Sequence, residues 1–391
     1  MNSIFSNIKG DKVIWAVVIL LSLSSTLAVY SSISTLAYKS ASKSQEIFMV
    51  KHIITLILGL GLMYWIHTIK YTYFSRISQL AYWLSIPLLL VTLVMGTNLN
   101  SASRWLTIPG VDVSFQTSDL AKLALIMYVA RLVAKKQGQV DDFKQTFMPI
   151  MIAIFVVCGL ILPANFSTAA VLFATCMLIM FVGRINIKYL LGLVGSGIVL
   201  FSLFVAIALN SNNEGRIGTW KKRIENFSND EVKDVNANYQ VNQAKIAIAT
   251  GGWSGKGPGK STQRNFLPHP YSDFIYAFII EEYGLGGGIF ILFLYLTLLL
   301  RTIIIASKID NPFGTFLALG CCFLLVFQAM INMAVGVNLF PVTGQPLPFL
   351  SKGGTSFMFT GIAIGIILSV SRGIETSKKE KTEKGGQLAA A

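Results

Sequence analysis

Charged residues are scarce in this sequence, since Asp, Glu, Lys and Arg together make up only 13% of its 391 residues. Soluble globular domains contain about 25% charged residues. Apolar side chains take their place: they form 53% of the chain, occur in long runs and give a mean hydropathy of +0.63. The composition therefore excludes an ordinary soluble domain and predicts a polytopic membrane protein.

Cysteine and histidine are also rare, with four and three residues. The cysteines all lie inside apolar runs, without paired spacing and without a histidine nearby. This pattern predicts neither a disulfide framework nor a metal site. We expect the four thiols to be packing residues. They are Cys158, Cys176, Cys321 and Cys322.

Acidic residues are outnumbered, because 18 Asp and Glu face 32 Lys and Arg, which gives a formal net charge of +14. The basic residues gather in short segments between the apolar runs. Such a distribution is typical of a protein oriented in a bilayer and does not indicate affinity for nucleic acid. No nucleic-acid partner is expected.

The apolar runs divide into windows close to the ~20 residues that a helix needs to cross a bilayer. They predict an all-α polytopic membrane protein with about ten transmembrane helices, in a single domain over residues 1–391. The first helix is expected to be retained rather than cleaved. The windows are residues 13–33, 49–66, 77–95, 118–134, 147–163, 168–184, 188–210, 273–300, 313–338 and 355–371.

The short loops predict the orientation of these helices. Seventeen Lys and Arg lie in the loops and tails on one side of the ten windows, and five lie on the other side. Because cytoplasmic loops are enriched in basic residues, both termini are expected in the cytoplasm, with the chain in the cytoplasmic membrane. The long loop of residues 211–272, between the seventh and eighth helices, is then extracytoplasmic. The charged tail, residues 373–391, is predicted to be disordered.

The segment of residues 239–288 is too polar and too rich in glycine to be a membrane span. It predicts a short helix over residues 241–249, then a glycine-rich loop that holds the glycines of residues 251–259, and then an apolar helix entered at Ser272 and Asp273. The loop is not a nucleotide-binding P-loop, because that motif requires glycine where Ser254 stands. Gly257 and Gly259 are therefore expected to allow a tight turn or the close approach of a ligand.

Ionisable residues inside a membrane span are costly, so each is a candidate for function. Two predicted helices and two outer loops direct such residues toward one region of the outer face, which predicts a polar cavity there. The residues are Asp119, Lys122, Asp273, Glu281, Glu282, Arg104 and Lys352.

Each of these residues also has a plainer explanation. Asp119 and Lys122, three apart on one helical face, could form an ion pair only, with the acid favoured by the helix dipole. Asp273 could be a capping residue. Glu281 and Glu282 could pair across helices, and the basic loop residues could bind lipid headgroups.

Four motifs add information that composition does not give: QTSDLAKLAL at 116–125, GGWSGKGPGKSTQRNFLPHPYSDFIYAFIIEEYG at 251–284, NPFG at 311–314 and GQPLPFLSKGGTS at 344–356. Together they resemble the SEDS family, ten-span membrane polymerases that make the glycan strands of bacterial peptidoglycan. The Gly-Pro-Gly-Lys-Ser-Thr-Gln run before Phe266 is more similar to the division members of that family than to the elongation members.

The resemblance implies a reaction between two lipid II molecules. The 4-hydroxyl of one GlcNAc attacks the anomeric carbon of a MurNAc, and undecaprenyl pyrophosphate leaves with inversion. Asp273 matches the acid that is essential in the family, as general base or as ligand of a divalent cation, Mg²⁺ or Mn²⁺. Cations would stabilise the charge that grows on the pyrophosphate. Candidates to bind substrate and pyrophosphate are Arg104, Lys122, Lys352 and Ser272, and candidates for supporting roles are Asp119, Glu281, Glu282, Gly257 and Gly259.

Three departures from the family pattern stand out. Where the family usually has Pro-Ser-Glu, this sequence has Thr-Ser-Asp and keeps the acid as Asp119. Where the family usually has the turn Pro-Asp-Phe-Gly-Thr, this sequence has Ala-Asn-Phe-Ser-Thr at 164–168 and lacks the acid. Lys352 is an added cation. The chain contains no transpeptidase motif, so the resemblance implies a class B penicillin-binding protein, similar to FtsI, as crosslinking partner, together with other division proteins.

Alternative functions stay open at this stage. A lipid II flippase should place charges at the membrane midplane on broken helices, whereas the candidates here lie toward the outer face. A non-catalytic scaffold of the division machinery would be favoured if Asp273 only capped its helix. An O-antigen-ligase-like transferase would share the chemistry but not the motif.

Overall fold

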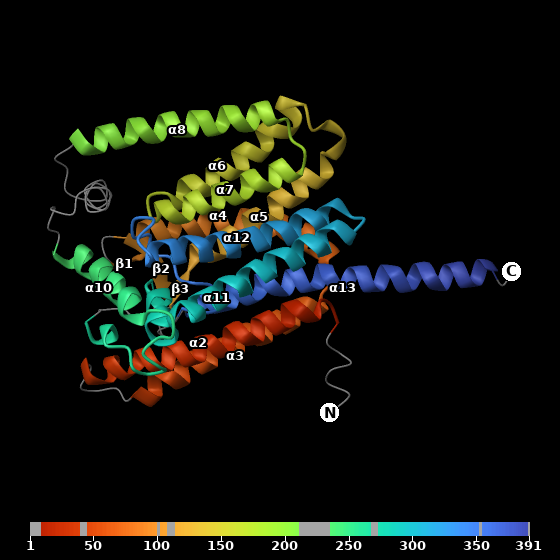
Figure 1. Cartoon of the computed structure of the whole chain (residues 1–391). Helices are drawn as coiled ribbons and strands as arrows, with labels where there is room; N and C mark the ends of the chain where they lie inside the picture. The colour runs from red at the N-terminus through yellow and green to blue at the C-terminus, as the bar shows by residue number, and fades with distance from the viewer. Residues whose placement is uncertain are drawn as a thin grey trace.

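The structure is a computed structural model that describes residues 9–39, 45–99, 102–107, 114–210, 235–266, 273–351 and 354–389. Long helices dominate it (Figure 1), which confirms the all-α polytopic class. In chain order the helices are α2 (Lys12–Lys39), α3 (Gln45–Thr68), α4 (Phe74–Met95), α5 (Thr117–Lys135), α6 (Met148–Ile161), α7 (Phe166–Val182), α8 (Ile187–Asn210), α10 (Val235–Gly251), α11 (Ile275–Lys308), α12 (Pro312–Gly336) and α13 (Thr355–Ala389). Short helical turns are η1 (Tyr71–Tyr73), η2 (Gln137–Gln139), η3 (Phe143–Phe147) and η4 (Gln263–Asn265).

Seven helical segments within the described residues are long and apolar enough to cross a membrane. Helices α5, α7 and α8 occupy the other three predicted windows. Helix α5 carries four charged residues, and α7 has only 17 residues. Every predicted window therefore contains a helix, and the total of ten crossings stays a prediction.

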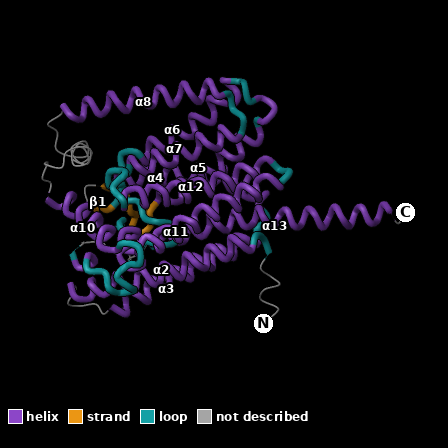
Figure 2. Tube along the Cα trace, viewed as in Figure 1, coloured by secondary structure: helices purple, strands orange, loops and turns teal. Residues whose placement is uncertain are grey.

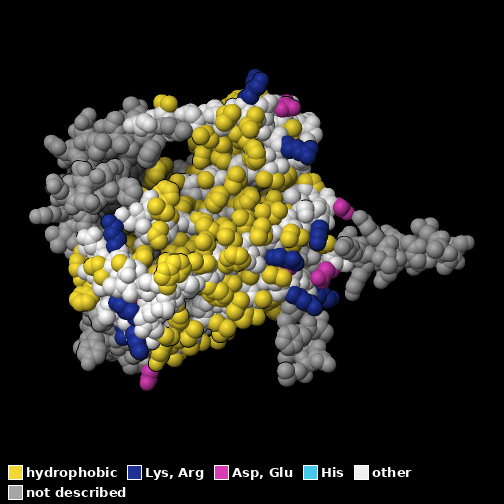
Figure 3. All heavy atoms as spheres, viewed as in Figure 1, with side chains coloured by type: hydrophobic (Ala, Val, Ile, Leu, Met, Phe, Trp, Pro, Cys, Tyr) yellow, Lys and Arg dark blue, Asp and Glu magenta, His cyan; other side chains and the backbone are white. Residues whose placement is uncertain are grey.

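The two ends of the bundle differ. The start of α2 and the far part of α13 lie at one end, whereas α10, the glycine-rich loop and a small sheet lie at the other (Figures 1 and 2). Hydrophobic side chains cover the middle of the visible face, and the Lys and Arg side chains lie toward its two ends (Figure 3). This distribution matches an apolar membrane interior between two polar surfaces.

Helix α12 forms the centre of the bundle, because it packs against α11, α5, α13 and α7. In its membrane-spanning window 72% of the residues are buried, compared with 22% for α3. Glycines allow other helices to approach closely, as where Gly361 of α13 faces the backbone of Gly59 in α3. Because α12 is so deeply buried, its polar side chains must form hydrogen bonds with other parts of the protein rather than with water.

The structure differs from the sequence-based expectation in two segments. Residues 97–116, expected as a loop, contain the antiparallel strands β1 (Thr97–Leu99), β2 (Ala102–Thr107) and β3 (Ser114–Gln116). The strands are too short to show a clear alternation of apolar and polar residues. Residues 373–389, expected to be a disordered tail, continue α13 beyond the bundle (Figure 1). This segment is rich in Lys and Glu, which favour helix.

Helix α11 is broken near its start, where Gly284 has φ 70° and ψ −174°. The glycine-rich loop supplies replacement hydrogen bonds at the break. The N–H groups of Lys256 and Gly257 donate to the carbonyl oxygens of Glu281 and Glu282, both at 2.9 Å. The first segment of α11 is thus joined to the loop by backbone hydrogen bonds.

Gly284→Ala is expected to destabilise the fold by at least about 1–3 kcal/mol, the usual cost of a side chain in this glycine-only backbone region. A Cβ at this position would also lie 2.1 Å from the carbonyl oxygen of Trp253. Thermal unfolding in detergent measures the effect. Gly286→Ala is the control, because its nearest new contact would lie at 4.0 Å. Equal melting temperatures for the two variants would contradict the prediction.

Candidate functional site

A polar cavity of about 170 Å³ lies between α5, the start of α7, the start of α11, α12 and the segment that joins α12 to α13. Its walls combine residues that lie more than 200 positions apart in the sequence. Two carboxylates, one ammonium group and several amides and hydroxyls face it. The lining residues are Trp105, Gln116, Asp119, Lys122, Asn165, Thr168, Asp273, Gln328, Gly344, Gln345, Pro346, Gly354 and Ser356.

Asp119 and Lys122 form an ion pair on α5, with 2.8 Å between Lys122 Nζ and Asp119 Oδ1. Their spacing of three residues places both on one face of the helix. Both are buried, at 5% and 8% exposure. The second carboxylate oxygen, Asp119 Oδ2, has no hydrogen-bond partner within the described part of the chain. The pair therefore places a buried lysine and its carboxylate partner in the wall of the cavity.

Asp273 lies two residues before the first residue of α11 and is partly buried. Its backbone carbonyl accepts a hydrogen bond from Asn332 Nδ2 at 2.9 Å. One turn earlier on α12, Gln328 Nε2 donates to the carbonyl of Pro346 at 2.8 Å. Two amides on one face of α12 thus hold both the Asp273 backbone and the segment after α12, which also lines the cavity.

The turn before α7 also reaches the cavity. Asn165 caps α7, because its Oδ1 accepts from the N–H of Thr168 at 3.3 Å. The hydroxyl of Thr168 in turn accepts from Gln345 Nε2 at 3.4 Å. The cavity therefore has a neutral amide at the turn where the family pattern has an acid.

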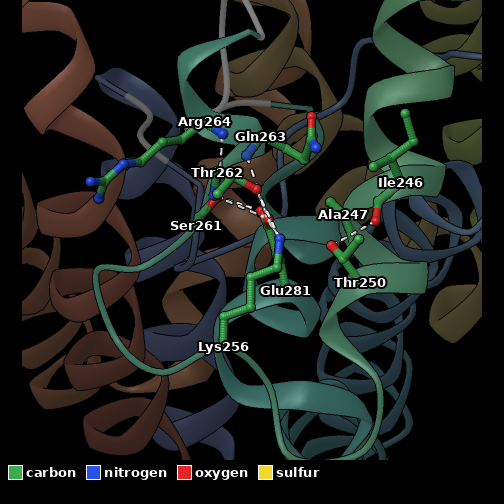
Figure 4. Close-up of polar contacts among 9 residues, drawn as sticks. All are labelled: Ile246, Ala247, Thr250, Lys256, Ser261, Thr262, Gln263, Arg264 and Glu281. Atoms are coloured by element: carbon green, nitrogen blue, oxygen red, sulfur yellow. Dashed lines mark hydrogen bonds and ion pairs between the residues drawn. The ribbon is translucent and has the colours of Figure 1, made fainter.

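Glu281, predicted to support the site, lies outside the cavity lining. It is fully buried, and its carboxylate accepts from Lys256 Nζ at 2.6 Å, from the N–H and hydroxyl of Thr262 at 3.1 and 2.9 Å, and from the hydroxyl of Ser261. Figure 4 shows these donors converging on it from the glycine-rich loop. Two turns into α11, the side chain faces that loop rather than the cavity. The geometry favours its role as an anchor of the loop.

Glu282 and the two loop glycines belong to the same anchored region. The hydroxyl of Ser31 in α2 donates to Glu282, and Arg264 donates to the Ser31 carbonyl at 3.0 Å. Gly257 and Gly259 have φ values of 99° and 74°, which a residue with a side chain rarely adopts. These glycines make the turns that the sequence predicted, but they do not line the cavity.

Three predicted substrate-binding residues cannot be placed at the site. Ser272 and Lys352 lie outside the described residues. Arg104 belongs to β2, and its side chain is likewise outside the described part of the chain. Asp119, Lys122 and Asp273 are thus the predicted residues that the structure brings together.

A family model for FtsW, RodA and SpoVE, described as a cell cycle protein, matches residues 11–376. The chain belongs to this family. This result confirms the resemblance to SEDS proteins that the sequence motifs gave. The family match spans the whole bundle, from the start of α2 to α13.

Comparison with individual proteins indicates the same FtsW/RodA/SpoVE family. The chain is 32% identical over 369 residues to the probable peptidoglycan glycosyltransferase FtsW of Trichlorobacter lovleyi, covering 93% of this chain and 94% of that protein. It is 33% identical over 319 residues to the stage V sporulation protein E of Bacillus subtilis, covering 81% and 84%. A solved structure described as "Structural coordination of polymerization and crosslinking by a peptidoglycan synthase complex" has a similar fold. Its TM-score is 0.72 at 23% identity, over 93% of this chain and 98% of that one.

Several cavity residues of this family member were not predicted from the sequence, among them Gln328, Gln345 and Thr168. Gln328 and the neighbouring Asn332 did carry a usable signal, because two amides spaced four apart inside an apolar helix are costly unless they have partners. Gln345 and Thr168 carried none, since amides and hydroxyls near helix ends are common.

The cavity of this family member has the donors that a divalent cation prefers. Mg²⁺ and Mn²⁺ bind carboxylate and carbonyl oxygens, often through one or two carboxylates together with substrate phosphates. Asp273, which lines the cavity and is partly buried, supplies one such carboxylate. A cluster of three or more His, Cys, Asp or Glu is absent from the described residues. The site therefore suits a cation shared with a phosphate better than one held by protein alone.

Proposed function

We propose that this chain is a peptidoglycan glycosyltransferase that polymerises lipid II at the outer face of the cytoplasmic membrane during cell division. The observation that carries the proposal is the shared cavity, where the acid Asp273 and the buried ammonium group of Lys122 face the same space. The names of the family's relatives support the reaction class.

The proposed transfer assigns one task to each group. The 4-hydroxyl oxygen of GlcNAc forms a bond to the anomeric carbon of MurNAc, and the bond from that carbon to the pyrophosphate oxygen breaks. Asp273 accepts the hydroxyl proton as general base. Lys122 stabilises the negative charge on the departing pyrophosphate. Because the base and the leaving group lie on opposite faces of the sugar, the configuration inverts.

A divalent cation, Mg²⁺ or Mn²⁺, would be held by Asp273 together with the pyrophosphate of the substrate and would neutralise pyrophosphate charge. The residues of the chain do the remaining work in this proposal. Asp119 orients the Lys122 ammonium group through their 2.8 Å ion pair. Gln345 and Ser356 add hydrogen-bonding groups for the polar part of the substrate.

A synthesis assay tests the proposed function. Purified protein is mixed with lipid II, and the glycan products are separated by length on a gel, with and without a chelator. We expect polymers with the metal present and loss of product on chelation. Transport of lipid II across liposome membranes without any polymer would favour a flippase instead.

The proposed partner is a class B penicillin-binding protein, which would crosslink the strands that this chain makes. The likeness to a chain from a peptidoglycan synthase complex supports this assignment. Other division proteins would join the same assembly.

The site is proposed to face outward, with both termini in the cytoplasm. In whole cells, a membrane-impermeant thiol reagent is expected to label Lys260→Cys but to label Lys135→Cys only after permeabilisation, because the basic loops lie inside. Both lysines are exposed, and the four native cysteines are buried and should not react with the reagent. Labelling of Lys260→Cys only after permeabilisation would reverse the orientation.

A further inference from the structure

Asn332 lies behind the cavity, near the end of α12, and is 1% exposed. Its side-chain amide nitrogen donates two hydrogen bonds, to the carbonyl of Asp273 at 2.9 Å and to the carbonyl of Gln345 at 2.7 Å. Both acceptors belong to residues that line the cavity, whereas Asn332 itself does not. A single amide group therefore joins two walls of the site.

The connection continues around the cavity. Gln345 Nε2 donates to the hydroxyl of Thr168 at 3.4 Å, which links the same wall to the start of α7. The start of α11, α12, the segment after α12 and the start of α7 are thus connected through Asn332 and Gln345. Apolar packing can slide by fractions of an ångström, but a buried donor that loses its acceptor costs free energy. The hydrogen bonds consequently fix how far apart the walls lie.

Asn332 is suited to donation at this position. Its oxygen, Oδ1, is buried without a hydrogen-bond partner among the described residues. The hydrogen bonds of this side chain to the described residues therefore come from its two N–H groups. An apolar residue of similar size would fill the space without joining the walls, and Asp would lack the amide protons.

We propose that Asn332 is a positioning residue that sets the location of Asp273 relative to the Gln345 segment of the cavity wall. The inference rests on the proposed function, in which Asp273 acts on a hydroxyl held between these walls. It assigns no contact between Asn332 and substrate. Its effect should therefore fall on the rate of the chemical step rather than on the binding of lipid II.

The test uses Asn332→Leu and Asn332→Asp in full-length protein, with Ser369→Ala as control. Ser369 is buried, and its hydroxyl donates to the carbonyl of Ile69 at the opposite end of the bundle. Both Asn332 variants are expected to lower kcat by about 10- to 100-fold, because a displacement of about 1 Å costs up to that factor. KM for lipid II should change by less than about twofold, because the substitutions remove no contact with the bound substrate. The control should keep both constants.

Two further measurements separate positioning from general destabilisation. In an Asp273→Asn background, Asn332→Leu should cause no additional loss of rate, because the group that it positions no longer acts. Hydrogen exchange should be faster for peptides covering 273–280 in Asn332→Leu, but not in the Ser369→Ala control.

The outcomes are distinguishable. If the wild-type protein makes no polymer, the proposed function fails, and the exchange experiment alone decides the positioning inference. Unchanged exchange at 273–280 in a folded Asn332→Leu protein would overturn it. So would a wild-type kcat in either Asn332 variant of an active enzyme.

Discussion

Asp273→Asn is expected to lower the rate of lipid II polymerisation by about 10²- to 10⁴-fold, the usual contribution of a general base. Asn has nearly the same shape as Asp, and the N-cap of α11 is the neighbouring Phe274, so the start of the helix should be kept. It cannot take a proton from the attacking hydroxyl, and it is a poor ligand for a divalent cation. The product on a gel should therefore disappear while the protein stays folded.

Folding and activity must be measured together for this variant. Its melting temperature should lie within a few degrees of the wild-type value, and it should still co-purify with a partner penicillin-binding protein. Asp273→Leu provides the comparison, because it removes both the charge and the polar atoms of the side chain. If Asp273→Asn polymerises at more than about a tenth of the wild-type rate, Asp273 is not the general base.

Lys122→Met is expected to lower both stability and activity, for separate reasons. Removing one partner of a buried ion pair costs up to about 3–5 kcal/mol, because the other charge stays buried alone. Here Asp119 and Lys122 are buried at a 2.8 Å separation. Losing one group that stabilises charge in the transition state costs about 10²- to 10³-fold in rate.

A second substitution separates these two effects. Lys122→Met with Asp119→Leu removes the stranded carboxylate, so the melting temperature should recover. The polymerisation rate should not recover, because the cation for the pyrophosphate is still missing. Recovery of the rate together with stability would show that the pair is structural only. Glycan synthesis and thermal unfolding on the same preparations give both readouts.

The loop anchored by Glu281 explains why a predicted supporting residue does not line the site. Glu281 and Asp273 lie on the same stretch of sequence, eight residues apart. From sequence alone both carboxylates pointed to one polar region. The break at Gly284 lets the loop fold back onto α11, and the loop then takes Glu281 as its anchor. A carboxylate inside an apolar helix can thus anchor a loop instead of acting in catalysis.

The sequence by itself determined the features that depend on local chemistry. Hydropathy is a property of contiguous residues, so the helical windows and the membrane class follow directly from it. The i, i+3 spacing of Asp119 and Lys122 is enough to place both side chains on one face of a helix. The motif around Asp273 was long enough to identify the family, which the comparison with known relatives confirms.

Only the tertiary structure decided which polar groups meet. The cavity is assembled from segments near residues 105–122, 165–168, 273, 328 and 344–356, and no local pattern records that they converge. Asn332 shows the reason: its hydrogen bonds go to carbonyls 59 and 13 residues away, and every residue offers a carbonyl. A backbone acceptor leaves no mark in the sequence, so the partner of a buried amide is decided by how the helices pack.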